Sequence, residues 1–346
     1  FKILNQEIGN HVSPFIIAEI SANHNGSLDI AKKSIIAAKQ AGASAVKIQT
    51  YTADTMTIDC NKRDFMIEEG LWKGKKLFDL YKEAGTPFEW HQELFDFAKE
   101  NDILIFSTPF DETAVDLLVS LNVPAFKIAS FEITDLPLIK YVAKQKKPIL
   151  ISTGMSNLKE IDDAISVILN EGNQDILLFH CISGYPTPVS QTNLGNIKIL
   201  SERINLPIGL SDHTLTNTAS IASISIGAVA IEKHFILNRK LGGPDASFSL
   251  EPAQFKILVE DCNDIYKALS NQQFSRSKVE TQNKKFRRSL YFVENLAPGT
   301  IIEEKHIRRI RPGYGLNPSM FSKVAGKRLA KYVEKGTPVS MEVLEN

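Results

Sequence analysis

The sequence predicts an α/β protein in which a (β/α)8 barrel is followed by a small β-rich domain. Eight short apolar runs recur in the first 270 residues, helical patterns separate them, and short strands and turns follow residue 283. This alternation of strands and helices is typical of a closed barrel with a parallel sheet. A doubly wound parallel sheet is the main alternative, because it is built from the same alternation.

The apolar runs are four to six residues long and rich in Ile, Val, Phe and Leu. Runs of this kind are typical of strands that are buried on both faces of a sheet. The predicted strands cover residues 15–20, 45–48, 103–106, 125–128, 148–151, 176–179, 207–210 and 228–231.

Segments with a helical spacing of apolar residues connect these strands. Gly42 and Gly172 follow two of the segments, as expected at helix ends, where the backbone often takes a left-handed turn. The predicted helices cover residues 29–40, 90–99, 112–121, 136–144, 158–169, 216–226 and 252–269.

Two connections are longer than the others. Residues 51–88 follow the second strand, with a helix expected over 63–82, and residues 233–250 form a polar, glycine-rich connection after the eighth strand. Long connections at the carboxyl side of barrel strands are often functional. A polar stretch after them predicts the domain limits: a barrel over 1–270, a linker over 271–282 and the small domain over 283–346.

Charge and cysteine content narrow the class of protein. The chain has 40 Lys and Arg against 40 Asp and Glu, and no apolar run approaches 18 residues, so we expect neither nucleic acid nor a membrane as a partner. Three distant cysteines without a CxxC pair indicate a reducing compartment, and we expect a cytoplasmic location. Residues 283–346 carry 13 basic against 6 acidic residues, which form either a solvated face or a surface that attracts an anionic substrate.

Polar side chains follow every predicted barrel strand. In a (β/α)8 barrel the active site lies at the carboxyl ends of the strands, so these side chains are expected to converge on one cavity. Each of them taken alone is more simply a solvated loop residue, but a complete ring favours a site. The ring consists of Glu19, Lys47, Gln49, Ser107, Thr108, Lys127, Ser152, Thr153, His180, Ser211, Asp212, His213, Glu232 and His234.

The ring has the chemistry of an anion site. Lys47 and Lys127 are cations on the second and fourth strands, and Ser130, Ser152 and Ser211 add hydroxyl donors. Together they are suited to a phosphate plus a carboxylate. The sequence has neither GxGxxG after the first strand nor a P-loop, which argues against nucleotide-binding folds. An aldolase that forms a Schiff base on one of the two lysines remains an alternative.

A metal site is the second hypothesis for the ring. His213 and His234 follow neighbouring strands, and Glu19, Asp212 and Glu232 lie at the same ends. Two neutral imidazoles with nearby carboxylates suit a divalent transition metal that keeps open positions. Isolated histidines are more often hydrogen-bonded structural groups, so spacing alone leaves both interpretations open.

The ordered motifs resemble the sialic acid synthase family along nearly the whole chain. The tail resembles the antifreeze-like (SAF) domain of these enzymes, through Arg287-Arg288-Ser289-Leu290 and Arg311-Pro312-Gly313. The matching barrel segments are residues 17–20, 23–26, 46–49, 107–110, 126–130, 152–155, 180–181, 185–188, 209–214 and 232–235.

The resemblance implies that the barrel binds phosphoenolpyruvate and a divalent metal, manganese first and magnesium or cobalt as alternatives. His213 and His234 match the metal ligands, and Glu19 matches a catalytic residue beside the sugar. The matches to phosphoenolpyruvate contacts are Lys47, Thr108, Lys127, Ser130, Ser152 and Ser211, with Ser183 where sialic acid members often have Asn. The matches to sugar contacts are Gln49, Tyr185, Asp245 and Arg311.

The resemblance also implies a homodimer in which the SAF domain caps the barrel of the partner subunit. Arg311 matches the tail arginine that reaches the partner's site in the family. An ice-binding or other non-catalytic sugar-binding protein is the alternative of a different class. It leaves the ring of polar strand ends unexplained, and ice binding does not suit a tail with this excess of basic residues.

Two stretches bear on the substrate. Residues 71–90 and 242–250 are similar to those of family members that make pseudaminic acid from 2,4-diacetamido-2,4,6-trideoxy-L-altrose, phosphoenolpyruvate and water. Members that make N-acetylneuraminate or legionaminate tend to have histidine after the aspartate of the second stretch, where this chain has Ala246. We therefore expect an N-acetylated amino-sugar substrate of the pseudaminic type, with the other two sugars as alternatives.

Overall fold

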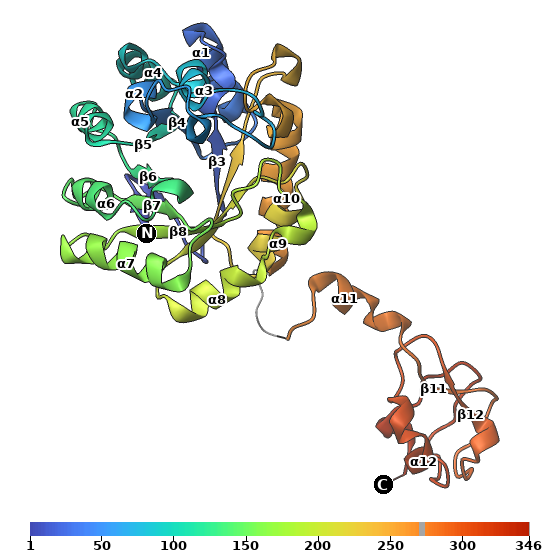
Figure 1. Cartoon of the computed structure of the whole chain (residues 1–346). Helices are drawn as coiled ribbons and strands as arrows, with labels where there is room; N and C mark the ends of the chain where they lie inside the picture. Colours follow the sequence, from blue (N-terminus) through green and yellow to red (C-terminus); the bar gives the residue numbers. More distant parts are fainter. Residues whose placement is uncertain (270–273, 346) are drawn as a thin grey trace. The chain divides into compact units, whose positions relative to one another are not determined.

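The computed structural model describes residues 1–269 and 274–345. The chain divides into two compact units, residues 1–270 and 271–346, each with its own apolar core (Figure 1). Of the predicted linker 271–282, residues 271–273 lie outside the described residues, and a short helix α11 (Lys278–Gln282) occupies its end. The domain limits proposed from the sequence therefore remain a prediction.

The first unit is a closed barrel of parallel strands in the order β10-β3-β4-β5-β6-β7-β8-β9. Closure confirms the (β/α)8 prediction and excludes the open doubly wound sheet. The strands are β3 (Phe15–Glu19), β4 (Ala45–Thr50), β5 (Leu104–Pro109), β6 (Phe126–Ile128), β7 (Ile149–Ser152), β8 (Ile176–Cys181), β9 (Ile208–Asp212) and β10 (Ala230–His234).

Helices surround the barrel (Figure 1). In α1 the Ser27 side chain accepts from the Ile30 amide at the start, and Ala31, Ile35 and Ala38 form its buried stripe. The barrel-unit helices are α1 (Leu28–Gln40), α2 (Ala53–Met56), α3 (Leu77–Ala84), α4 (His91–Glu100), α5 (Glu112–Ser120), α6 (Leu136–Ala143), α7 (Leu158–Asn170), α8 (Gly195–Arg203), α9 (Thr218–Ser225) and α10 (Pro252–Leu269).

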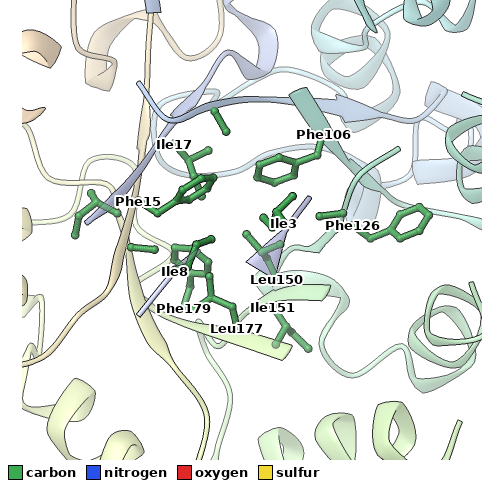
Figure 2. Close-up of a cluster of buried hydrophobic side chains, with 14 of the residues drawn as sticks. Ile3, Ile8, Phe15, Ile17, Phe106, Phe126, Leu150, Ile151, Leu177 and Phe179 are labelled. Carbon is green, nitrogen blue, oxygen red and sulfur yellow. The ribbon is translucent and has the colours of Figure 1, made fainter. Parts of the chain in front are cut away.

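An apolar core fills the barrel, and a small hairpin contributes to it. The hairpin pairs β1 (Lys2–Ile3) with β2 (Gln6–Glu7). Figure 2 shows Ile3 and Ile8 among the side chains of several barrel strands, including Phe15, Phe106 and Phe179. Phe15 begins its strand and Glu19 ends it, so apolar residues come first along β3 and the polar group comes at its carboxyl end.

The connection over residues 51–88 differs from the prediction. The helix expected over 63–82 is present only in part, as a 3-10 turn (Arg63–Phe65) and helix α3, and the stretch between them is not helical. Gly70 and Gly74 take φ values of 79° and 86°, which a right-handed helix cannot contain. Residues 63–82 have a helical spacing of apolar residues, but Gly70 and Gly74 interrupt the helix that this spacing predicts.

The second unit is small and built from short elements. Strands β11 (Ser289–Phe292) and β12 (Ile307–Ile310) pair antiparallel, and a short helix α12 (Phe321–Val324) follows. Its buried core includes Leu290, Phe292 and Val339. Over residues 1–269 and 274–345, no helix has the length and apolar character needed to cross a membrane.

Candidate active site

Four charged side chains from four barrel strands meet at the carboxyl end of the barrel, and we call them the mouth cluster: Glu19, Lys47, Lys127 and Glu232. Lys47 Nζ lies 3.2 Å from Glu19 Oε2 and 3.2 Å from Glu232 Oε1. Lys127 Nζ lies 2.7 Å from Glu232 Oε2. Each group is almost fully buried. The parallel register aligns Glu19 with Lys47 and with His234, which explains how residues over 200 positions apart converge.

The two carboxylates of the mouth cluster differ in their pKa. Burial raises the pKa of Glu19 to about 7, and Glu232 adds to the rise while Lys47 opposes it. Burial also opposes ionisation of Glu232, but the ammonium groups of Lys127 and Lys47 outweigh it and hold its pKa well below the usual range. Two ammonium groups therefore face one firmly ionised carboxylate and one that exchanges a proton near neutral pH. The cluster keeps positive character for an anionic ligand.

Hydroxyl groups surround these cations. Lys47 donates to Thr108 Oγ1 at 3.2 Å, and Ser211 donates to Glu232 at 3.3 Å. Ser152 Oγ is buried and has no hydrogen-bond partner among the described residues. Buried polar atoms are nearly always paired in folded proteins, so an unpaired one at a predicted site favours a ligand.

Ser130 and Ser183 converge on Gly154. The Gly154 amide donates to Ser130 Oγ at 3.1 Å. A Cβ on Gly154 would lie only 2.3 Å from Ser183 Oγ and 2.7 Å from Ser130 Oγ, so any other residue would displace both hydroxyls. The structure thus brings Ser183 to the predicted anion site, although sequence reasoning left its match uncertain.

His213 and His234 lie side by side, with ring centroids 5.5 Å apart. His213 Nδ1 is 2.9 Å from the Ile182 carbonyl oxygen, a contact that needs a proton on Nδ1 and leaves the lone pair on Nε2. His234 Nδ1 is buried without a hydrogen-bond partner. Burial holds the pKa of His234 well below its ordinary value, so this ring is neutral at pH 7.

The two rings fit a divalent metal that keeps open positions, because imidazole nitrogen suits such ions and the rings lie side by side. Burial keeps His234 neutral. Burial of His213 is outweighed by Cys181 and the Ile182 carbonyl oxygen, which raise its pKa, so a metal there would displace its proton. Within the described ranges, no three His, Cys, Asp or Glu side chains gather closely enough to hold a metal by themselves. A metal at this point would take its remaining ligands from water or substrate. Asp212, which the sequence suggested as a further ligand, does not contribute.

Asp212 and two other predicted ring residues face away from the barrel interior. Asp212 pairs with Lys233 at 2.7 Å and accepts from Ser220 of α9. His180 contacts the Thr192 carbonyl oxygen, and Ser107 contacts Thr50. Side chains alternate between the faces of a strand, so of two adjacent polar residues only one can reach the site.

Sequence reasoning missed Cys181, the residue of β8 that does face the ring. Its Sγ lies 3.9 Å from His213 Nδ1. Burial opposes ionisation of the thiol, but His213 and Lys127 outweigh it and lower its pKa to about 7. Residues two positions apart on a strand share a face, and Phe179 faces the interior, with its ring 4.6 Å from Lys127 Nζ. Cys181, two positions further along β8, therefore faces the interior too.

The predicted sugar residues of the barrel unit contact Glu19 and the two histidines. Gln49 Nε2 donates to Glu19 Oε1 at 2.8 Å, and Asp245 Oδ2 lies 3.7 Å from His234 Nδ1. Tyr185 packs over the histidines, with its ring centroid 4.3 Å from that of His213. The structure therefore brings together the barrel-unit residues that the resemblance assigned to the site, and leaves out the ring residues Asp212, His180 and Ser107.

An aromatic wall continues from Tyr185, and its residues come from the two stretches that the sequence connected with the substrate, although neither was predicted individually as a site residue. Phe248 lies 5.3 Å from Tyr185 and Trp72 lies 6.0 Å from it, measured between ring centroids. The Trp72 indole also donates to the Pro244 carbonyl oxygen at 2.9 Å. The two long connections, 51–88 and 233–250, thus meet beside the histidines. Arg311 is exposed and belongs to the second unit.

Comparisons with known proteins identify the family. The chain matches the NeuB family over residues 34–274 and the SAF domain over residues 287–345. It is 41% identical to the pseudaminic acid synthase of Helicobacter pylori, over 96% of this chain and 98% of that protein. It is 35% identical to the N,N'-diacetyllegionaminic acid synthase of Legionella pneumophila, over 97% of this chain and 96% of that protein.

A solved structure shows the same fold. The crystal structure of N-acetylneuraminic acid (sialic acid) synthetase from Leptospira borgpetersenii in complex with citrate superposes with a TM-score of 0.74 at 29% identity. The match covers 82% of this chain and 94% of that chain.

Proposed function

The chain belongs to the NeuB family, and from this premise we propose that it is a pseudaminic acid synthase. It would condense phosphoenolpyruvate with 2,4-diacetamido-2,4,6-trideoxy-L-altrose and water, and release phosphate. The family consists of synthases that condense phosphoenolpyruvate with an amino-sugar. The altrose substrate is supported by the 41% identity to a pseudaminic acid synthase, against 35% and 37% to two legionaminic acid synthases.

One observation supports a two-substrate site above all others. Buried polar atoms on three different strands lack hydrogen-bond partners in the described structure: Glu19 Oε2, Ser152 Oγ and His234 Nδ1. All three belong to residues at the carboxyl end of the barrel. Asn23, His24, Thr86 and Glu132 also have a buried atom without such a partner, and Glu19 Oε2 has an ion pair with Lys47. Unpaired buried polar groups cost free energy, so the three at the strand ends favour ligands that complete them.

The anion side of the site suits phosphoenolpyruvate. Lys47 and Lys127 supply the charge for a phosphate and a carboxylate. The hydroxyl donors proposed to complete this subsite are Thr108, Ser130, Ser152, Ser183 and Ser211. Holding both anionic groups fixes the C3 atom of the enol relative to the sugar, which lowers the entropic part of the barrier.

A Schiff-base aldolase is less well supported, because its lysine must lose a proton to attack a carbonyl. Lys47 lies against two carboxylates, which raise its pKa despite burial. Burial lowers the pKa of Lys127, which leaves this lysine as the candidate for the aldolase, although Glu232 at 2.7 Å opposes the loss of its proton. If borohydride trapped substrate on either lysine, the aldolase would replace the synthase as the preferred function.

We propose that His213 and His234 hold the divalent metal, manganese first and magnesium or cobalt as alternatives. When bound, such an ion acts as a Lewis acid toward a carbonyl oxygen of the substrate. The chain's own part is to orient His213 through the Ile182 carbonyl oxygen and to keep His234 neutral through burial.

Glu19 is the proposed catalytic carboxyl group. As C3 of phosphoenolpyruvate bonds to the sugar aldehyde carbon, positive charge develops at C2, water adds there, and the C–O bond to phosphate then breaks. Glu19 is positioned either to stabilise that charge or to transfer a proton. A pKa near 7 suits either role at neutral pH.

Gln49, Tyr185 and Asp245 are the proposed sugar contacts, and we extend the proposal to Arg311 of a partner subunit in a homodimer. The excess of basic residues in 283–346 supports a tail that acts on anionic or polar ligands.

Deleting residues 283–346 should abolish turnover while the barrel, which has its own core, still folds. Full activity of the truncated chain would reject this role. A cytoplasmic location stays a prediction.

The deciding experiment measures phosphate release from phosphoenolpyruvate with manganese and each of three sugars. These are the altrose, N-acetylmannosamine and the precursor of legionaminic acid. Release with the altrose alone would establish both the reaction and the substrate. Release with another sugar would retain the reaction and reject the altrose, whereas no release from folded, metal-loaded protein would reject the synthase.

A further inference from the structure

Ser21 has a backbone conformation that its residue type disfavours. It follows β3 and begins a 3-10 turn (Ser21–His24), with φ at 45°. Among the described residues other than glycine that have a positive φ, Ser21 is the buried one. A left-handed conformation costs a residue with a Cβ free energy, and such strain is retained mostly where a side chain is needed for function.

The Ser21 hydroxyl connects two predicted sugar contacts. Oγ donates to Asp245 Oδ2 at 2.6 Å and accepts from Gln49 Nε2 at 2.9 Å. Gln49 Nε2 also donates to Glu19 Oε1 at 2.8 Å. An unbroken chain of hydrogen bonds therefore runs from Glu19 through Gln49 and Ser21 to Asp245. Three of its four members were predicted from the sequence as site residues, and Ser21 was not.

This chain fixes which atoms face a ligand. Both protons of the Gln49 amide nitrogen are used, and no described residue donates to its amide oxygen, which is left to accept from a substrate. Asp245 is buried, and the Ser21 hydroxyl on Oδ2, together with the Ala22 backbone amide, stabilises the carboxylate and contributes to its orientation.

We propose that Ser21 is a positioning residue for the sugar, because its hydroxyl orients Gln49 and Asp245 together and so contributes to the choice between sugars. The inference rests on the proposed function and deepens it. Glycine adopts a positive φ freely and would relieve the strain, but it has no hydroxyl. Alanine would keep the strain and also lack the hydroxyl. The two substitutions therefore separate the backbone from the hydrogen bonds.

Ser249 provides a matched control in the same connection. It is fully buried, donates to the backbone oxygen of Asp245 at 2.7 Å and accepts from Asn23 at 2.8 Å. Its hydroxyl therefore anchors the same loop without touching the Asp245 carboxylate. Ser249→Ala tests whether any loosening of this loop has the effect that is predicted for Ser21.

The experiment measures phosphate release by the full chain with manganese, phosphoenolpyruvate and each of the three sugars, for wild type, Ser21→Gly, Ser21→Ala and Ser249→Ala. Both Ser21 variants should raise the KM of the preferred sugar about tenfold, as expected for a lost hydrogen bond to a charged group. The KM of phosphoenolpyruvate should change less than about twofold, and discrimination between sugars should fall. Thermal unfolding should show Ser21→Gly to be more stable than Ser21→Ala.

Ser249→Ala should lower thermal stability but keep the wild-type KM of the sugar. An unchanged sugar KM and unchanged discrimination in Ser21→Gly would overturn the inference, and this variant carries the test even if Ser21→Ala does not fold. The same KM rise in Ser249→Ala would also overturn it, since loop anchoring would then explain the effect. Wild-type protein that turns over none of the sugars would overturn the proposed function, and this inference with it.

Discussion

Strands β9 and β10 present charged residues to two opposite environments. Toward the barrel interior, Glu232 faces two lysines in the mouth cluster. Toward the helices, Asp212 and Lys233 form an ion pair at 2.7 Å in which both side chains are 1% exposed. Adjacent positions in the sequence thus supply one charged group to each face of the same strand.

The two environments differ in how completely the protein satisfies its own polar groups. On the outer face, Lys233 also donates to the carbonyl oxygens of Thr214 and Thr216, and Asp212 accepts from Ser220 and the Thr214 amide. At the mouth, by contrast, Glu19 Oε2 makes an ion pair but no hydrogen bond. A completed buried pair indicates a structural role, and an incomplete one indicates a place for a ligand.

The largest expected effect follows from removing a charge at the mouth. Glu19→Gln should lower turnover by about a thousandfold, within the range for loss of a general acid or base. Manganese binding, measured by calorimetry, should stay close to wild type because the two histidines are untouched. Near-normal turnover of this variant would contradict the catalytic role of Glu19.

Substitutions in the Asp212–Lys233 pair on the outer face should lower stability and leave turnover nearly unchanged. Lys233→Met leaves Asp212 buried without its cation and should lower the free energy of unfolding by about 3–5 kcal/mol. Because Asp212→Asn in the same chain removes the unpaired charge, the double variant should recover part of this loss. Denaturant unfolding measures both, and the folded fraction should retain its kcat within a few-fold.

An exposed pair serves as the matched control for Lys233. Lys198 and Glu202 lie 3.7 Å apart, and both side chains are about 70% exposed. Lys198→Met should change the free energy of unfolding by less than about 0.5 kcal/mol. If Lys233→Met and Lys198→Met lowered the free energy of unfolding equally, burial of the Asp212–Lys233 pair would not increase its contribution to stability.

The same alternation explains how much of the site the sequence could predict. The apolar runs located the strands, and the residues that follow them located the mouth, so Glu19, Lys47 and His234 were identified without coordinates. Asp212 was placed wrongly because the ring was built from proximity to the strand ends, whereas the side-chain period of two decides the face.

Ser21 was beyond sequence reasoning for a different reason. It lies past the end of β3, where no period applies, and its importance depends on a positive φ that only the folded backbone reveals. Its partner Asp245 is 224 positions away in a connection without regular strands. Contacts of this kind depend on tertiary structure, and local patterns carry no signal for them.

His24 is an exception to the contrast between a satisfied outer face and an unsatisfied mouth. It has a buried nitrogen without a hydrogen-bond partner but does not belong to the mouth cluster. Nε2 lacks a hydrogen bond, and the ring packs edge-on against Trp90. Burial lowers the pKa of His24 to about 4, below the value near 6.5 of the unfolded chain. The contribution of neutral His24 to the free energy of unfolding is therefore complete above pH 6.5 and is lost as the pH falls toward 4, by on the order of 2–3 kcal/mol.

The variant His24→Asn tests this prediction. It keeps an acceptor for the Gly26 amide, which in the wild type donates to His24 Nδ1. Denaturant unfolding of this variant should show a flatter acid limb, with a residual slope from His91, His180 and His234, whose pKa values burial also lowers. An acid limb identical to that of wild type would mean that the unpaired nitrogen of His24 has no energetic consequence.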